Sequence, residues 1–258
     1  MTRDFPTRRA ALLGMGAGAF ALSGCDQLSQ NRTFQRMLEA AEKLNLHGHR
    51  LVLNSSQPLA REYRPSDISP VFKANGTVKP DSADYGRLAQ TGFSDWRLTI
   101  GGLVKKPLSL SLDELKAMPS RTQITRHDCV EGWSAIGQWT GVPLGRLLES
   151  AELMGSAKYI VFRCADDLEQ SRDGSGLYYE SIDLVDAFHP QTIMAYAMNG
   201  QPLPVPHGAP LRLRVERQLG YKMAKYVMRI EAVEDFAKIG FGKGGYWEDR
   251  GYEWYAGI

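Results

Sequence analysis

Apolar residues in this chain recur at spacings that predict short strands and short helices after an irregular N-terminal region. Met37, Leu38, Ala41 and Leu44 fall on one face of a predicted helix. Residues 47–95 then show no sustained period and contain several prolines among Asn, Asp and Ser. An irregular stretch of this length is usually functional or wraps around its domain.

The pattern becomes regular near residue 96. Alternation of apolar and polar residues over 96–100 predicts a strand, which Gly101-Gly102 connects by a turn to a second strand. Ser111 and Glu114 form a capping box that predicts the start of a helix. The order strand, turn, strand, helix therefore opens the regular part of the chain.

Further extended segments follow, separated by brief helices. Helices are expected from Pro143 to Leu148 and over 181–188, and Asn199-Gly200 predicts a turn. Because no βαβ repeat or internal duplication occurs, the fold class is mixed α+β and rich in strands. Residues rich in glycine and aromatics near the C-terminus predict an arm laid over the domain, at 240–257. Apolar patterns predict strands at 122–128, 159–164, 192–198, 211–215 and 226–233.

Composition is that of an ordinary globular protein. Of the 258 residues 43% are hydrophobic and 23% charged, which excludes collagenous, disordered and multi-span membrane classes. Three of the 31 basic and one of the 29 acidic residues lie in the first 25 positions, so the remaining chain carries 28 of each. A neutral body lacks the clustered positive charge that a nucleic-acid partner requires, and no such partner is expected.

Residues 1–25 predict a targeting peptide that is separate from the fold. Arg8 and Arg9 precede a weakly apolar stretch of small residues that is too short to span a bilayer stably. This arrangement resembles a twin-arginine export signal, which serves proteins exported already folded, often with a cofactor. The residues ending at Cys25 resemble a lipobox, and Asp26 resembles the residue that retains such lipoproteins at the inner membrane. The alternative is an accidental cysteine in a plain signal peptide.

The three cysteines, Cys25, Cys129 and Cys164, form no C-x-x-C or C-x-x-C-H pattern, so no haem attachment, iron–sulfur cluster or zinc ribbon is expected. Cys129 follows a predicted strand in a loop of ionisable and aromatic groups, unlike an inert core cysteine. It could be a nucleophile with His127 or His207 as base, or a thiolate ligand of a metal that brings most of its own ligands. A structural cysteine is the third possibility.

An ordered set of motifs favours the metal-ligand interpretation. These motifs are HDCVEGWS at 127–134, WTGVPL at 139–144, HPQT at 189–192, MNGQPLP at 198–204, HGAPLR at 207–212 and GYKMAK at 220–225. The set resembles the molybdopterin-binding domain of the sulfite oxidase family, in family order over roughly residues 70–233. The resemblance implies a sulfite-oxidase-type fold in a single catalytic domain, expected at 26–258. It also implies one molybdenum per chain, held by the sulfurs of one pyranopterin and by the thiolate of Cys129.

The resemblance implies further cofactor contacts. The phosphate of the pterin would be held by Arg212 and by the three residues 223–225 that follow Gly-Tyr-Lys. A buried phosphate needs such cations and oriented N–H groups. Arg212 alternates with Leu211 and Leu213, which leaves it on a side that can face a ligand. The alternatives are a satisfied loop histidine for His207, a surface arginine on an edge strand for Arg212 and a buried core cysteine for Cys164. The expected contacts are Asn75, Cys164, His207, Arg212, Met223, Ala224 and Lys225.

Departures from the family pattern bear on the substrate. Sulfite oxidases have an arginine before the asparagine and an Ala-Gly-Asn-Arg-like run after the ligand cysteine, both serving an anionic substrate. This chain has Ala74 and Val130-Glu131-Gly132-Trp133 at those places. The run is closer to the catalytic subunit of bacterial periplasmic methionine-sulfoxide reductases, whereas His207 follows the sulfite oxidase pattern.

We therefore expect an exported molybdenum oxidoreductase that performs two-electron oxygen-atom transfer on a small or sulfoxide-type substrate. Glu131, Trp133 and His127 are candidates for the substrate side, with Glu131 either exchanging a proton or acting only as a solvated loop carboxylate. A separate membrane or c-type cytochrome would be the electron partner, and a lipid anchor would be the one contact with the membrane. The rival functions are a cofactor-less cysteine hydrolase and a non-catalytic extracytoplasmic binding domain.

Overall fold

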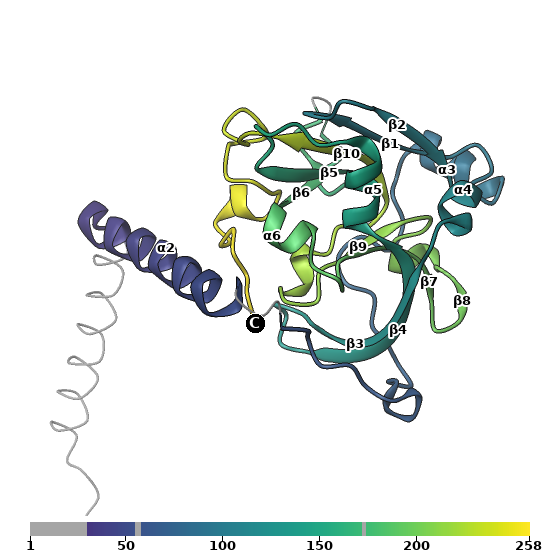
Figure 1. Ribbon diagram of the computed structural model, residues 1–258, viewed down its shortest axis with the longest axis horizontal. Helices are drawn as coiled ribbons and strands as arrows, with labels where there is room; N and C mark the ends of the chain where they lie inside the picture. Colours follow the sequence, from purple (N-terminus) through teal and green to yellow (C-terminus); the bar gives the residue numbers. More distant parts are fainter. Residues whose placement is uncertain (1–29, 55–57, 172–173) are drawn as a thin grey trace, which may run out of the picture. The chain divides into compact units, whose positions relative to one another are not determined.

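The computed structural model describes residues 30–54, 58–171 and 174–258 (Figure 1). The chain divides into two compact units, Met1–Gln57 and Pro58–Ile258. The residues behind the export and lipidation predictions, Arg8, Arg9, Cys25 and Asp26, lie outside the described ranges. Within those ranges, no helix combines the length and apolar character needed to cross a membrane.

Helix α2 (Arg32–Asn54) is longer than the sequence pattern predicts. The side chain of Asn31 caps it by accepting hydrogen bonds from the backbone N–H groups of Thr33 at 2.9 Å and Phe34 at 3.2 Å. The helix continues beyond residue 47, where irregular structure was expected, because no proline interrupts the chain before Pro58.

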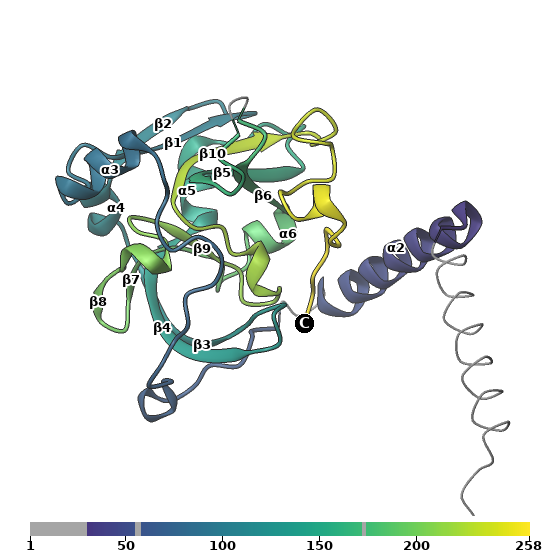
Figure 2. The same ribbon diagram turned by 180° about the vertical axis from the view of Figure 1, so that it is seen from behind.

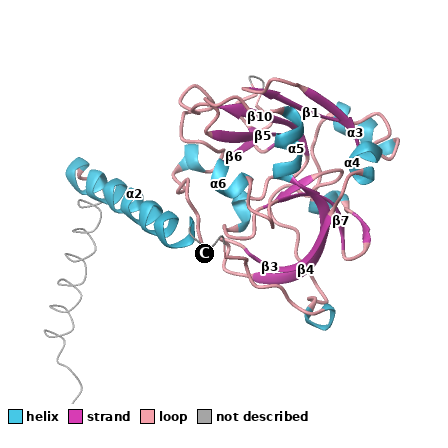
Figure 3. Ribbon diagram, in the orientation of Figure 1, coloured by secondary structure: helices cyan, strands magenta, loops and turns pink. Residues whose placement is uncertain are grey.

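Two sheets build the second unit (Figures 1 and 3). In the described residues the first sheet has the order β2-β1-β10-β5-β6, and the second has the order β3-β4-β7-β8 with β9 also paired to β7. Strands β1 and β10 run parallel and the other named pairs are antiparallel, so the predicted mixed architecture is confirmed. The strands are β1 (Arg97–Gly102), β2 (Leu108–Ser111), β3 (Arg121–Asp128), β4 (Ser134–Pro143), β5 (Tyr159–Asp167), β6 (Leu177–Asp183), β7 (Ile193–Met198), β8 (Gln201–Pro202), β9 (Arg212–Arg214) and β10 (Val227–Val233).

Short helices connect the strands (Figure 3). The predicted capping box is confirmed, because the N–H of Glu114 donates to Ser111 Oγ at 3.2 Å and the N–H of Ser111 donates to Glu114 Oε2 at 2.7 Å. The α-helices of this unit are α3 (Ala83–Gln90), α4 (Leu112–Ala117), α5 (Leu144–Ala151) and α6 (Leu184–Ala187). Single turns of 3-10 helix are η1 (Pro65–Asp67), η2 (Val205–His207), η3 (Gly220–Lys222) and η4 (Glu248–Arg250).

Three local predictions are wrong. The predicted turn at Gly101-Gly102 is the end of strand β1, and the connection to β2 follows it. Strand β4 has no counterpart in the predictions because glycines occupy part of its buried face and hide the alternation. The helix predicted over 181–188 is reduced to α6, because β6 extends to Asp183, whose side chain then caps the helix.

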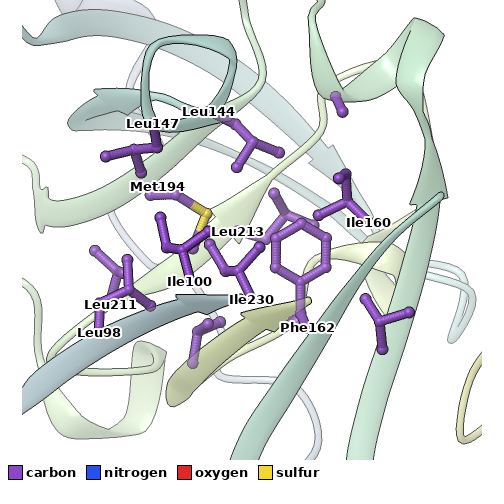
Figure 4. Packing of buried hydrophobic residues seen from close by; sticks show 14 of the residues in the cluster. Leu98, Ile100, Leu144, Leu147, Ile160, Phe162, Met194, Leu211, Leu213 and Ile230 are labelled. Carbon is purple, nitrogen blue, oxygen red and sulfur yellow. The ribbon is translucent and has the colours of Figure 1, made fainter. Parts of the chain in front are cut away.

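The main core is apolar and contains side chains from both sheets and from α5 (Figure 4). Leu98, Ile100, Phe162 and Ile230 of the first sheet belong to the same buried cluster as Met194 of β7. Figure 4 shows these side chains grouped with Leu144, Leu147, Ile160, Leu211 and Leu213. Burial of this cluster fixes the positions of the strand ends around the site described below.

The irregular segment before α3 and the C-terminal arm both lie against the sheets (Figure 2). Glu62 forms an isolated bridge with Thr125 of β3, and the N–H of Ser69 donates to the carbonyl of Ile136 on β4 at 3.0 Å. Gly245 of the arm forms a bridge with Glu180 of β6. The predictions of a wrapping loop and a covering arm are thus confirmed.

Candidate functional site

A cavity of about 160 Å³ lies beside the end of strand β3 and is lined by segments far apart in the sequence. The irregular segment before α3, the loop after β3, the end of β5, the η3 region and the arm all contribute to its wall. The lining residues are Asn75, Gly76, Thr77, Cys129, Val130, Glu131, Asp166, Leu168, Tyr178, Gly220, Tyr221, Met223, Lys225, Trp247 and Tyr252.

The thiol of Cys129 is free and 8% exposed, and it lies on this wall. A tight turn holds the residue, because its N–H donates to the carbonyl of Trp133 at 2.9 Å and its carbonyl accepts from Gly132 at 3.0 Å. Gly132 has φ +86°, a conformation that glycine adopts without strain. Burial raises the pKa of the Cys129 thiol, so a thiolate here needs a bound cation to stabilise it.

Lys225 and Arg212 are buried cations whose side chains both pass close to Gly208. Lys225 Nζ donates to the carbonyls of Asn75 at 2.6 Å, Pro206 at 3.1 Å and Thr77. Burial and the charge of Arg212 lower the pKa of Lys225 to about 7. In the described residues, neither cation has a carboxylate partner.

Arg212 is completely buried and only partly satisfied. Its Nη1 donates to the carbonyl of His207 at 3.0 Å, but Nε and Nη2 have no partner in the described residues. Burial and the neighbouring Arg214 lower the pKa of Arg212 to about 9. Unpaired N–H groups of a buried guanidinium are costly, and an anionic ligand would satisfy them.

His127 does not make the contact that a hydrolase would need. Its Nδ1 accepts from Arg214 Nη1 at 3.0 Å and lies 3.3 Å from Met223 Sδ. Burial, Arg214 and other nearby cations hold its pKa well below the usual range. In the described chain, no hydrogen bond joins Cys129 to a histidine, which removes the geometric basis for a cysteine–histidine nucleophile.

The remaining predicted substrate-side residues lie at the rim. Glu131 lines the cavity, accepts from Trp133 Nε1 at 2.9 Å and pairs with the exposed ammonium of Lys73 at 3.4 Å. These donors lower the pKa of Glu131. Trp133 does not line the cavity, and its ring packs edge-on against Phe72.

Several predicted cofactor contacts do not line this cavity. Asn75, Met223 and Lys225 line the cavity, whereas His207, Arg212, Ala224 and Cys164 do not. Cys164 is buried on β5 and lines a different cavity, together with Arg163 and Arg250. Burial, Arg212 and Lys225 lower the pKa of His207 to about 4.

Sequence reasoning missed part of this wall. Asp166 lies two residues after Cys164 on β5, and a charged residue near the end of a buried strand was the available signal. Trp247 and Tyr252 come from the C-terminal arm. The aromatic composition of the arm was the available signal, but it does not indicate a function. The rings of Trp247 and Tyr252 stack with centroids 5.3 Å apart.

Comparison with known proteins identifies the family. A model described as the oxidoreductase molybdopterin binding domain matches residues 85–239. The chain belongs to this family. The predictions of a molybdopterin-binding oxidoreductase and of a mixed-sheet fold are thereby confirmed.

Relatives within the family carry more specific names. A protein of Azospira oryzae, named provisionally as the protein-methionine-sulfoxide reductase subunit YedZ1, is 35% identical over 98% of this chain and 89% of its own length. The protein-methionine-sulfoxide reductase catalytic subunit MsrP of Xanthomonas axonopodis pv. citri is 41% identical over 60% of this chain. The match covers 50% of the length of that relative, so this chain spans about half of it. Among solved structures, the sulfane dehydrogenase SoxCD of Paracoccus pantotrophus matches with a TM-score of 0.49 at 25% identity, covering 55% of this chain and 39% of that one.

The residues of the site fit a molybdopterin. Cys129 offers a free thiol at the cavity, and such a soft ligand suits molybdenum. Arg212 and Lys225 offer buried positive charge, and two N–H-bearing nitrogens of Arg212 have no partner among the described residues, as a phosphate group requires. The family assignment and the donor set therefore agree.

Proposed function

We propose that this chain is the catalytic subunit of an extracytoplasmic molybdenum enzyme that reduces a sulfoxide by two-electron oxygen-atom transfer. The free thiol of Cys129 on a cavity wall that also holds Lys225, with the partly unsatisfied Arg212 nearby, in a chain of this family, carries the proposal. When bound, the cofactor supplies a molybdenum ion that exchanges two electrons and an oxygen atom with a substrate. Electrons would come from a separate membrane or c-type cytochrome.

The protein contributes ligation, charge and enclosure. Cys129 would bind the metal through its sulfur, and Arg212 with Lys225 would hold the phosphate by charge-assisted hydrogen bonds. Arg214 and His127 pack behind Met223 and support this part of the wall. Trp247 and Tyr252 restrict access of water from the side of the arm.

The wall of the cavity favours a neutral sulfoxide over sulfite. Glu131 brings a carboxylate to it, which repels an anionic substrate. The sulfur and methyl group of a methionine sulfoxide match apolar and aromatic surface. This surface is formed by Val130, Leu168, Tyr221, Trp247 and Tyr252. The names of the relatives support the same substrate class.

Metal analysis and activity assays test the proposal. The purified protein should contain one molybdenum per chain and should reduce methionine sulfoxide with reduced viologen faster than it oxidises sulfite with ferricyanide. Cys129→Ser should abolish the reduction and lower the molybdenum content. When both chains are cofactor-free, the midpoint of unfolding should differ little, because the ligand thiol contributes to the metal more than to packing.

Three outcomes would contradict this function. Activity in a protein free of metal and pterin would exclude a molybdenum enzyme. Rapid alkylation of Cys129 in the loaded protein would favour a nucleophile, because a metal-bound sulfur resists alkylation. Faster turnover of sulfite than of any S- or N-oxide would reverse the proposed direction.

We also propose export through the twin-arginine route and a lipid anchor at Cys25, which the sequence motifs support. Arg8→Lys together with Arg9→Lys should leave cofactor-loaded protein in the cytoplasm, whereas Arg3→Lys should not. Cys25→Ser should release the protein from the membrane fraction. Fractionation with molybdenum analysis measures both effects, and normal export of the folded, loaded double variant would exclude this route.

A further inference from the structure

Asp166 is a buried acid on the cavity wall to which the proposed function has assigned no role. It is 3% exposed, and its Oδ1 has no hydrogen-bond partner in the described residues. The hydroxyl of Thr77 hydrogen-bonds to the same carboxyl group. Buried polar atoms without partners are uncommon in native proteins, and a perturbed acid in a cleft often marks a functional site.

The backbone around Asp166 is irregular. The pairing of β5 with β6 changes register between Arg163 and Asp167, and Asp166 lies within this interval. Bulges of this kind are frequent beside active sites, where they redirect a side chain. The same short segment contributes Leu168 to the cavity wall.

Other polar groups on the wall are committed to partners. The carboxylate of Glu131 pairs with Lys73 and accepts from Trp133. Lys225 Nζ donates to backbone carbonyls. The hydroxyls of Tyr178 and Tyr221 donate to the carbonyls of Tyr221 and Glu253. Asp166 therefore has an unpaired oxygen, whereas the charged groups of Glu131 and Lys225 and these two tyrosine hydroxyls are engaged.

The surroundings of Asp166 keep it able to exchange a proton near neutral pH. Burial raises its pKa to about 6, while the Lys225 ammonium opposes this shift. An acid that titrates close to the working pH is effective in proton transfer. The titratable groups that interact with it are Tyr85, Cys164, Asp167, Tyr178, Lys225 and Tyr226.

We infer that Asp166 is the proton donor for sulfoxide reduction, an inference that rests on the proposed function. In this reaction the sulfur–oxygen bond breaks and the sulfur gains two electrons from an external cytochrome-type carrier. The oxygen leaves as water with two protons. The neutral carboxyl of Asp166 gives up one proton, and solvent reprotonates it for the second.

Asp166→Asn tests this role because the amide keeps the size of the side chain but cannot transfer the proton. With methionine sulfoxide and reduced viologen, kcat should fall about 100-fold or more while KM changes little. The wild-type kcat should decrease as pH rises through the pKa of this acid, and the variant should lack that decrease. Asp166→Glu should recover part of the activity, and Asp84→Asn, on the exposed face of α3, should behave as wild type.

Two measurements that do not depend on turnover separate the alternatives. Molybdenum and pterin contents should be unchanged in Asp166→Asn, and their loss would assign Asp166 to cofactor binding and overturn the inference. In the cofactor-free chain, NMR of labelled aspartate should show a carboxyl that titrates near pH 6 and is absent from the variant. If Asp166→Asn keeps the wild-type kcat and pH profile, the inference about Asp166 is overturned and the proposed function is not. Absence of sulfoxide reduction by the molybdenum-loaded wild type would overturn the proposed function as well.

Discussion

Arg212 and Lys225 are buried, and among the described residues neither forms an ion pair with a carboxylate. Burial and the charge of Arg214 lower the pKa of Arg212 to about 9, and burial and the charge of Arg212 lower that of Lys225 to about 7. Both values lie below those of free side chains, so each group loses its proton at a lower pH than usual. A bound phosphate would reverse the shifts, because an anion favours the charged forms.

The affinity of the cofactor-free chain for inorganic phosphate should therefore fall as pH rises above neutrality. Loss of the proton first from Lys225 and then from Arg212 should each lower affinity by up to about tenfold per pH unit. Calorimetry at constant ionic strength measures this dependence. Lys225→Gln should remove the pH dependence of phosphate affinity near pH 7. Arg229→Gln, which changes an exposed residue of β10, should preserve it. Constant affinity up to pH 10 would contradict the assignment.

Strands β1 and β10 approach closely at Gly102, and this contact explains why glycine is the last residue of strand β1. A Cβ at Gly102 would lie 2.2 Å from the carbonyl oxygen of Ala232, and the residue has φ +79°. At Gly101 the nearest atom to such a Cβ is Arg229 Nη2 at 4.0 Å. The close approach therefore concerns the second glycine.

Gly102→Ala should lower the free energy of unfolding by about 2–4 kcal/mol, because both the contact and the backbone conformation oppose a side chain. Gly101→Ala is the matched control and should change it by less than about 1 kcal/mol. Urea denaturation measures both. Equal losses in the two variants would contradict the importance of this β1–β10 contact.

Across the whole second unit, one buried lysine joins three segments that are distant in sequence. Lys222 Nζ donates to Glu180 of β6 and to Glu248 of the arm, each at 2.5 Å. Burial and the nearby Glu248 carboxylate raise the pKa of Glu180 well above its ordinary value. Because Trp247 of the same arm lines the cavity, the cluster connects closure of the site to global stability.

Lys222→Met should lower the free energy of unfolding at neutral pH by about 3–5 kcal/mol, since it leaves two buried carboxyl groups without their cation. Loosening of the arm should also accelerate alkylation of Cys129 in the cofactor-free chain. Lys243→Met, an exposed change on the arm, is the control. Chemical denaturation and timed alkylation measure the two effects, and wild-type values for both would show that the cluster does not hold the arm.

Features that depend on neighbouring residues were predictable from the chain alone. The capping box at Ser111 and the turn at Asn199-Gly200 follow from side-chain chemistry and backbone preference over a few residues. The position of Cys129 after a strand is equally local. The family was recognisable because its motifs are short and occur in a set order, and the matched domain confirms it.

Features that depend on contacts between distant segments needed the tertiary structure. Burial makes Asp166 an acid with a raised pKa, but its place on the same wall as Cys129 results from the packing of β5 against other strands. Trp247 reaches that wall because the arm is attached through Lys222, a contact that no local pattern encodes. From the sequence alone Gly102 is predicted in a turn, and only its pairing with Ala232 of β10 shows that it ends a strand. In each case the deciding energy comes from burial and close contact between distant parts of the chain. The local sequence of one part does not specify which other part it will contact.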